Sequence, residues 1–290
     1  MLPAEVQKKI KMIEISTRKL VNNQLSGEYH TAFKGQGMTF AEFREYVPGD
    51  DVRAISWALT ARAGKPYIKK FDEERELTLI LAVDVSGSTD FGSGEFFKGE
   101  VMTHLAAALA FSAVKNNDQI GLLLFSDQVE LFVPPKKGRG HVQRILRDLL
   151  FHKPKSQATN LSVSLDYLQG ILKKKATVFI FSDFMDKGFE ISLRSLGRKH
   201  DVISVVVQDS AEQDLPDMGV VDLQDPETGL ILTVDTSSLE FRQTLKRQVL
   251  QQKEVRDKIL RSSQVDRIDI VSNKNYFDPL ISFFKKRHKK

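Results

Sequence analysis

Short apolar runs along most of the chain alternate with segments in which apolar residues recur at helical spacing. From Glu76 onward, the runs rich in β-branched and aliphatic side chains predict strands at 77–85, 119–125, 129–133, 177–182, 202–208 and 267–271. The segments with helical spacing are 96–115, 142–151, 161–173, 238–261 and 276–287. Strands alternating with helices predict a doubly wound α/β fold, with a mostly parallel sheet covered by helices on both faces.

Two parts of the chain depart from this alternation. Residues 3–25 carry apolar positions at helical spacing, and the glycine-rich, aromatic segment that follows them fits no long helix. We therefore expect a small irregular N-terminal lobe containing β-structure over residues 1–75 and an α/β domain over residues 76–290. Within that domain, residues 218–236 hold a proline and a glycine between two strand-like runs, which predicts an inserted β-hairpin.

Composition excludes several classes of protein. The 290 residues are 41% hydrophobic and 28% charged, as in soluble globular proteins, and none is cysteine, which excludes disulfides and thiolate metal ligands. The uncharged apolar stretches, such as Leu77 to Val83, are far shorter than the roughly 20 residues of a membrane-spanning helix. The N-terminus lacks the apolar core of a secretion signal. We expect a cytoplasmic protein without a membrane span.

The net charge of +5 arises at the C-terminal end of the chain. Five basic residues lie in the last six positions: Lys285, Lys286, Arg287, Lys289 and Lys290. Without them, basic and acidic residues balance at 38 each, so no basic face is expected and nucleic acid is not a predicted partner. The plainer interpretation of this tail is a solvated helix end, and the alternative is a binder of anionic surfaces.

Oxygen-bearing side chains follow two of the predicted strands. Asp84, Ser86 and Ser88 form a D-x-S-x-S motif after the first strand of the α/β domain, Thr159 precedes a helix, and Asp183 follows a later strand. Ligands of doubly wound sheets bind outside the carboxyl ends of the strands, where the strand order reverses. Carboxylates and hydroxyls are hard ligands, which suit Mg²⁺, Mn²⁺ or Ca²⁺ and not zinc.

A site with two carboxylates and several neutral hydroxyls leaves its cation electrophilic, with a position open to an outside carboxylate. It would bind an acidic group of a partner without needing to perform chemistry. The competing interpretation is that these side chains cap helices and turns. Three such caps would have to coincide, which favours the metal site.

This constellation resembles the metal-ion-dependent adhesion site (MIDAS) of von Willebrand factor A domains. In that family, an Asp, two Ser, a Thr on a later loop and an Asp after a later strand bind Mg²⁺ or Mn²⁺, and an Asp or Glu of the partner completes the coordination shell. The resemblance implies a von Willebrand factor A-like fold and assigns the metal to Asp84, Ser86, Ser88, Thr159 and Asp183.

The N-terminal lobe carries a second motif. Residues 35–62 read GQGMTFAEFREYVPGDDVRAISWALTAR, and this segment resembles the signature of the domain of unknown function 58 (DUF58) family. The closing segment, 265–287, is also similar to the end of that family. Genes of the family commonly neighbour those of MoxR-type AAA+ ATPases. The resemblance therefore implies an adaptor or accessory role, with such an ATPase as partner.

The charged residues of this motif have two interpretations. Arg44, Asp50, Arg53 and Arg62 can form ion pairs that hold the lobe together and fix it to the α/β domain, or they can form a face that binds a partner. We favour the structural interpretation, and we expect Trp57 to lie in the core.

The leading hypothesis is thus a non-enzymatic interaction module that binds a divalent cation. The alternative is a Mg²⁺-dependent hydrolase that uses the same carboxylates. The sequence argues against an enzyme because it holds neither a G-x-S-x-G elbow nor a GxxxxGK[ST] loop, and no histidine lies near Ser86 in the sequence.

Overall fold

The computed structural model describes residues 10–15, 17, 21, 25–32, 39–72, 77–212 and 216–287. The chain divides into two compact units: one spans residues 33–76, and the other consists of residues 1–32 together with residues 77–290. The first 32 residues group with the larger unit, whereas the sequence predicts one lobe over residues 1–75. The reason is packing, because Tyr29 of helix α2 (Ser26–Ala32) is buried edge-on against the ring of Phe284.

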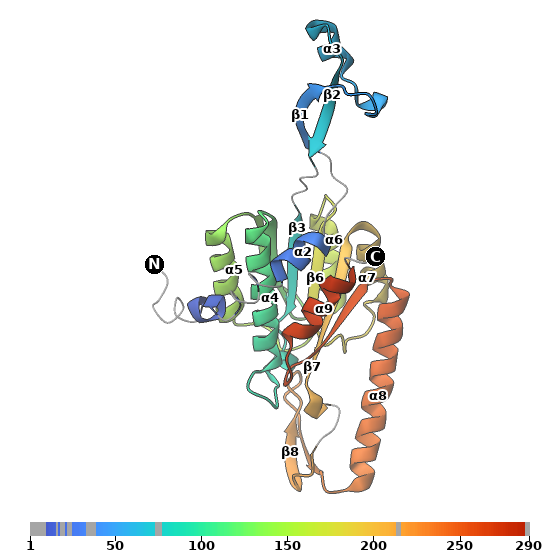
Figure 1. Cartoon of the computed structure of the whole chain (residues 1–290). Coiled ribbons are helices and arrows are strands. Elements are labelled where there is room, and N and C mark those ends of the chain that lie inside the picture. Colours follow the sequence, from blue (N-terminus) through green and yellow to red (C-terminus); the bar gives the residue numbers. More distant parts are fainter. Residues whose placement is uncertain are drawn as a thin grey trace. The chain divides into compact units, whose positions relative to one another are not determined.

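A six-stranded sheet forms the centre of the larger unit, as Figure 1 shows. Its strands are β3 (Thr78–Asp84), β4 (Gln119–Phe125), β5 (Val129–Lys136), β6 (Thr177–Ser182), β7 (Asp201–Gln208) and β10 (Asp266–Val271). They lie in the order β10-β7-β6-β3-β4-β5, and every pair is parallel except β4–β5 at one edge. The doubly wound, mostly parallel sheet predicted from the sequence is confirmed.

Helices cover both faces of this sheet. They are α4 (Lys98–Lys115), α5 (Arg139–Phe151), α6 (Leu161–Ile171), α7 (Glu190–Lys199), α8 (Leu239–Ser262) and α9 (Phe277–Arg287). Helices α4, α5 and α9 contact one face, and α6 and α7 contact the other. Side chains alternate along β3, so Ile80 and Ala82 join the core beneath α6 and α7. Helix α7 was missed in the sequence because only Leu193 and Leu196 of its ten residues are buried.

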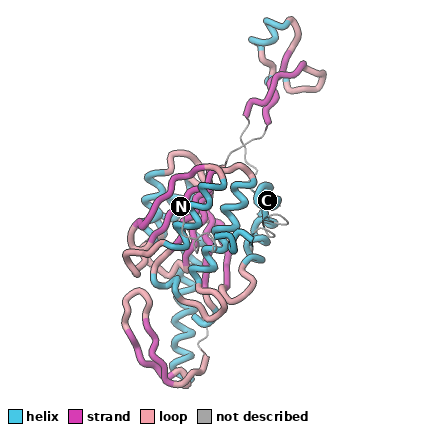
Figure 2. Tube along the Cα trace, turned by 90° about the vertical axis from the view of Figure 1, so that its left-hand side faces the viewer, coloured by secondary structure: helices cyan, strands magenta, loops and turns pink. Residues whose placement is uncertain are grey.

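The predicted hairpin is present. Strands β8 (Val220–Gln224) and β9 (Ile231–Asp235) pair antiparallel as a separate two-stranded sheet at the start of α8, where Figure 2 shows them apart from the main sheet. Most of their side chains are exposed. An isolated two-stranded hairpin is marginal in water, so its position depends on the contacts that its turn makes.

The smaller unit pairs β1 (Thr39–Glu45) with β2 (Tyr67–Asp72) and adds the short helix α3 (Trp57–Ala63). Short strands were expected here, but α3 was not. The prediction that Trp57 is a core residue was wrong, because its side chain is 68% exposed. Among the described apolar residues of this unit, only Ile68 is buried, so the unit has too little core to enclose an indole ring.

None of the helices in the described residues combines the length and apolarity needed to cross a membrane. The cytoplasmic location stays a prediction. The basic tail is partly helical, since α9 runs to Arg287, whose guanidinium pairs with Asp266 and Asp201. Lys289 and Lys290 lie outside the described residues.

Candidate functional site

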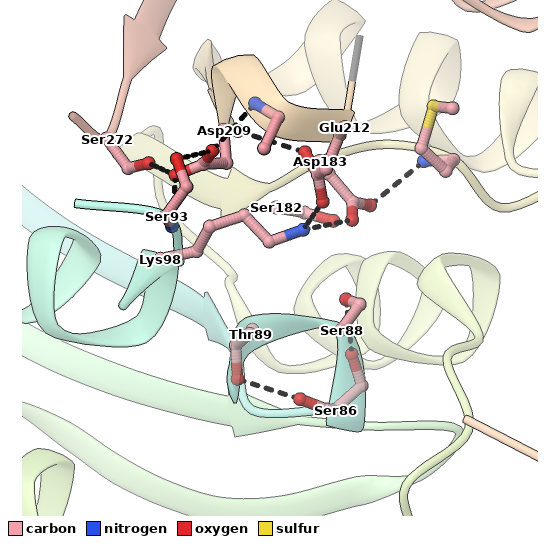
Figure 3. A network of polar contacts seen from close by, with 12 residues as sticks. Ser86, Ser88, Thr89, Ser93, Lys98, Ser182, Asp183, Asp209, Glu212 and Ser272 are labelled. Carbon is pink, nitrogen blue, oxygen red and sulfur yellow. Dashed lines mark hydrogen bonds and ion pairs between the residues drawn. The ribbon is translucent and has the colours of Figure 1, made fainter. Parts of the chain in front are cut away.

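The D-x-S-x-S motif forms a tight loop at the carboxyl end of β3. Asp84 is 1% exposed, and its two carboxylate oxygens accept hydrogen bonds from the Ser86 amide at 2.9 Å and from the Ser182 hydroxyl at 2.8 Å. Past Ser86 the chain turns through a short 3₁₀ segment in which the Thr89 hydroxyl donates to the Ser86 carbonyl. This turn brings the hydroxyl oxygens of Ser86 and Ser88 to 3.2 Å of each other (Figure 3).

Asp183 reaches the same rim from the neighbouring strand. Strands β3 and β6 are adjacent and parallel, with Val83 opposite Phe181, so the residues after each strand emerge side by side. From β3 the chain proceeds to β4 on one side, while β6, β7 and β10 lie on the other. The two carboxylates therefore flank the point where the strand order reverses, which is the usual ligand position in such sheets.

The surroundings of Asp84 disfavour the ionised form of its carboxylate. Burial raises the pKa of Asp84, and the negative charge of Asp183 raises it further, while hydrogen bonds from Ser86 and Ser182 oppose the shift only in part. The resulting pKa is about 7. Positive charge delivered to this point would relieve the repulsion.

Thr159 arrives on the loop before α6. The carbonyl of Gln157 accepts the Gly87 amide at 2.9 Å, which fastens this loop to the one that carries Ser86. Asn160 caps α6 by accepting from the Val163 amide. Thr159 is not the cap, because its hydroxyl donates to Oε1 of Glu227, a residue of the hairpin turn, at 2.8 Å. The capping interpretation thus applies to Asn160, and Thr159 stays available as a ligand at the edge of the sheet.

A buried lysine, Lys98, lies beside Asp183 and was not anticipated. It is the first residue of α4 and 1% exposed, and its Nζ lies 3.2 Å from Asp183 Oδ2 and 2.5 Å from Glu212 Oε1 (Figure 3). Burial lowers the pKa of Lys98, but the two carboxylates outweigh burial and hold that pKa above its ordinary value. A cation is disfavoured at a helix N-terminus, so these partners are what stabilises it.

A second buried carboxylate, Asp209, follows β7. It accepts hydrogen bonds from the Ser93 amide at 3.0 Å, the Ala211 amide at 2.9 Å and the Ser272 hydroxyl at 2.5 Å, and also from the Ser93 hydroxyl (Figure 3). Burial raises the pKa of Asp209, but the hydrogen bonds from Ser272 and Ser93 outweigh it and bring that pKa down to about 2. This cluster ties together loops that follow three different strands.

The four predicted residues of the smaller unit do not form one cluster. Arg44 Nη2 lies 2.6 Å from Asp50 Oδ1, and the other Asp50 oxygen accepts the Val47 amide, so this pair holds the turn between them. Arg53 and Arg62 are exposed. The ion pair within the lobe agrees with the structural interpretation. A pairing with residues 73 and 74, which would fix the lobe to the α/β domain, lies outside the described residues.

Across the described residues, no group of three or more His, Cys, Asp or Glu side chains is placed to hold a metal ion. The predicted site is of another kind, since three of its five oxygen donors are the hydroxyls of Ser86, Ser88 and Thr159. Asp84, Ser86 and Ser88 share one hydrogen-bonded loop, the charge of Asp183 acts on Asp84, and Thr159 is attached through its own loop.

Comparison with known proteins gives a family and distant structural likenesses. Residues 42–255 match the family described as "Protein of unknown function DUF58". The uncharacterized proteins Mb1516 of Mycobacterium bovis and Rv1480 of Mycobacterium tuberculosis are each 31% identical over 225 residues, 77% of this chain and 71% of theirs. The conserved hypothetical protein BatB from Bacteroides thetaiotaomicron is 14% identical and aligns over 74% of this chain and 100% of its own, with a TM-score of 0.48. An aerotolerance-related membrane protein from Bacteroides fragilis is 12% identical and aligns over 73% and 98%, with a TM-score of 0.49. Structural likenesses this loose carry no argument about function.

Proposed function

The chain belongs to the DUF58 family of proteins of unknown function, and from this premise we propose a function on the chemistry of its own residues. It is a non-enzymatic protein-interaction module of the von Willebrand factor A type. Its MIDAS-like site binds Mg²⁺, or Mn²⁺ or Ca²⁺ in its place, and the bound cation captures an acidic side chain of a partner protein.

The observation that carries this proposal is the pair of hydroxyls beside a buried carboxylate. Adjacent oxygen ligands of an octahedral Mg²⁺ lie about 3 Å apart, because each lies about 2.1 Å from the ion. The Ser86 and Ser88 oxygens, 3.2 Å apart, match that spacing, and Asp84 next to them carries an ionisable group that burial and Asp183 destabilise. The donor set therefore fits a hard cation.

The residues that would hold the cation are Asp84, Ser86, Ser88, Thr159 and Asp183. When bound, the cation would supply an electrophilic centre that a carboxylate can approach from solvent. The chain's own part is to orient the donors: the Ser86 amide and the Ser182 hydroxyl fix Asp84, and the 3₁₀ turn aims the two serine hydroxyls.

The partner and the absence of catalysis are parts of the same proposal. The family resemblance supports a MoxR-type AAA+ ATPase as the protein that offers the acidic residue, and the exposed Arg53 and Arg62 supply a second contact.

A hydrolase would need a base beside its nucleophile, but among the described residues the Ser86 hydroxyl pairs with Ser88 and with no histidine. Hydrolysis of phosphatase substrates that EDTA abolishes would instead support the hydrolase.

The decisive experiment is a calorimetric Mg²⁺ titration of the full chain and of Asp84→Ala. We expect the variant to lose about 100-fold or more in Mg²⁺ affinity, because it loses a charged oxygen donor, and to lose partner capture as well. Asp84→Asn, which keeps an oxygen for the Ser86 amide, separates metal loss from misfolding. Asp166→Ala removes an exposed carboxylate of α6 and serves as the control. Equal Mg²⁺ affinities for wild type and both Asp84 variants would contradict the proposal.

A further inference from the structure

The turn between β8 and β9 is internally braced. The Asp225 carboxylate accepts hydrogen bonds from the Glu227 amide at 3.0 Å and from the Thr228 hydroxyl at 2.6 Å, and the Gly229 amide donates to the Asp225 carbonyl. Gly229 has a φ of 72°, which a side chain would disfavour. These contacts orient Glu227, which is itself exposed, at the tip of the hairpin.

That tip lies on the candidate site. A Cβ on Gly87 would come within 2.2 Å of the Pro226 carbonyl oxygen, so the hairpin backbone packs directly against the loop that carries Ser86 and Ser88. The next residue, Glu227, accepts the hydroxyl of Thr159 at 2.8 Å. The residue after Ser86 is thus a glycine because another segment of the chain approaches it closely. Gly87 does not have a positive φ.

The charge around Glu227 is negative. Asp183, Asp186 and Asp225 are close enough to act on its carboxylate. Among the described residues, no lysine, arginine or histidine forms an ion pair with Glu227, in contrast to Asp183, which has Lys98. Glu227 therefore places its charge near three other carboxylates and one of its oxygens on a hydroxyl of the predicted ligand set, which is the arrangement expected of a carboxylate that ligates a cation at this site.

We propose that Glu227 is the chain's own carboxylate ligand for this cation site, delivered by the inserted hairpin to the position that an outside acidic residue would take. This inference rests on the proposed function and adds its regulation. An acidic partner must displace Glu227 before it can bind the cation. The partner's apparent affinity is therefore its intrinsic affinity multiplied by the fraction of molecules in which Glu227 is displaced. The hairpin is therefore a built-in competitor.

The test is a Mg²⁺ titration of the full chain, in chloride and in acetate at equal ionic strength, with Glu227→Gln and Asp222→Asn. Glutamine retains an oxygen for the Thr159 hydroxyl, so the hairpin contact is preserved while the charge is removed. Asp222, on the same hairpin, accepts from Thr233 and is the matched control. We expect Glu227→Gln to bind Mg²⁺ about tenfold more weakly in chloride, and acetate to recover part of that loss. Wild type and Asp222→Asn should not respond to acetate.

The outcomes separate the two proposals. Glu227→Gln with wild-type Mg²⁺ affinity, alongside an Asp84→Asn variant that has lost binding, overturns the assignment of Glu227 and leaves the cation site standing. A weakening that acetate does not reverse reduces Glu227 to a long-range charge effect and also overturns the assignment. No Mg²⁺ binding by the wild-type chain overturns the proposed function and this inference together.

Discussion

Two carboxylates at the same end of the sheet, Asp84 and Asp209, both have almost no exposed surface, yet their pKa values are shifted in opposite directions. Asp84 is 1% exposed with a pKa of about 7, and Asp209 is 0% exposed with a pKa of about 2. Figure 3 draws both the Asp209 cluster and the serine loop that follows Asp84. Burial raises the pKa of both groups, so the lowered pKa of Asp209 must come from its neighbours.

The neighbours of Asp209 are all donors, whereas Asp84 faces a second carboxylate. Two hydroxyls and two amides compensate Asp209, so its negative charge is stabilised without any ion. Asp84 has one amide and one hydroxyl donor and the repulsion of Asp183. The comparison makes Asp209 a structural brace, and it supports the proposal that Asp84 belongs to a cation site.

The largest expected effect comes from removing the ammonium beside Asp183. Lys98→Met leaves the carboxylates of Asp183 and Glu212 without that partner, and breaking a buried pair in this way costs about 3 to 5 kcal/mol of unfolding free energy. If Asp84 and Asp183 form a cation site, Mg²⁺ should increase the unfolding free energy of this variant more than that of wild type. Urea unfolding with and without Mg²⁺ measures the loss caused by the substitution and the gain from Mg²⁺. Lys199→Met, on an exposed position of α7, is the control, and a loss below 1 kcal/mol in Lys98→Met would contradict the prediction.

The next effect tests whether Asp209 acts as a structural brace. Asp209→Ala leaves the Ser93 amide and the Ser272 hydroxyl without their acceptor, which should cost about 3 kcal/mol of stability. Because Asp209 is not a predicted ligand, Mg²⁺ affinity should change less than twofold. Urea unfolding and calorimetry on the same variant check the two halves. A variant that kept its stability but lost Mg²⁺ binding would reverse the roles assigned to the two carboxylates.

The smallest effect is a pH dependence. The folded pKa of Asp209, about 2, lies below its unfolded value of 3.8, so its contribution to stability is complete above about pH 4 and is lost as the pH falls towards 2. The difference corresponds to about 2 kcal/mol. Asp84 has the opposite sign: because its folded pKa is raised to about 7, stability falls as the pH rises from about 4 to 7, and the loss is complete above pH 7. Urea unfolding of wild type and Asp209→Asn between pH 2 and 5 measures the first effect; parallel curves would contradict it.

The strands and most helices were accessible from the sequence because their signal is local. Buried parallel strands such as β6 carry a continuous apolar run between their ends, and α4 carries its apolar face across eighteen residues. Asp84, Ser86 and Ser88 were accessible for the same reason, since one short turn carries all three. Trp57 was misplaced because aromatic character alone predicts burial, while the size of the surrounding unit decides whether a core exists.

The sequence by itself therefore determined the α/β architecture, the hairpin and the three oxygen donors of the first loop, all of which depend on neighbouring residues or on regular spacing. The tertiary structure decided which distant charges surround them. Lys98 meets Asp183 across 85 positions and Glu212 across 114, and Thr159 meets Glu227 across 68. No periodicity encodes such pairs, because they arise only when the strand order brings the loops to one rim and a separate hairpin packs on it.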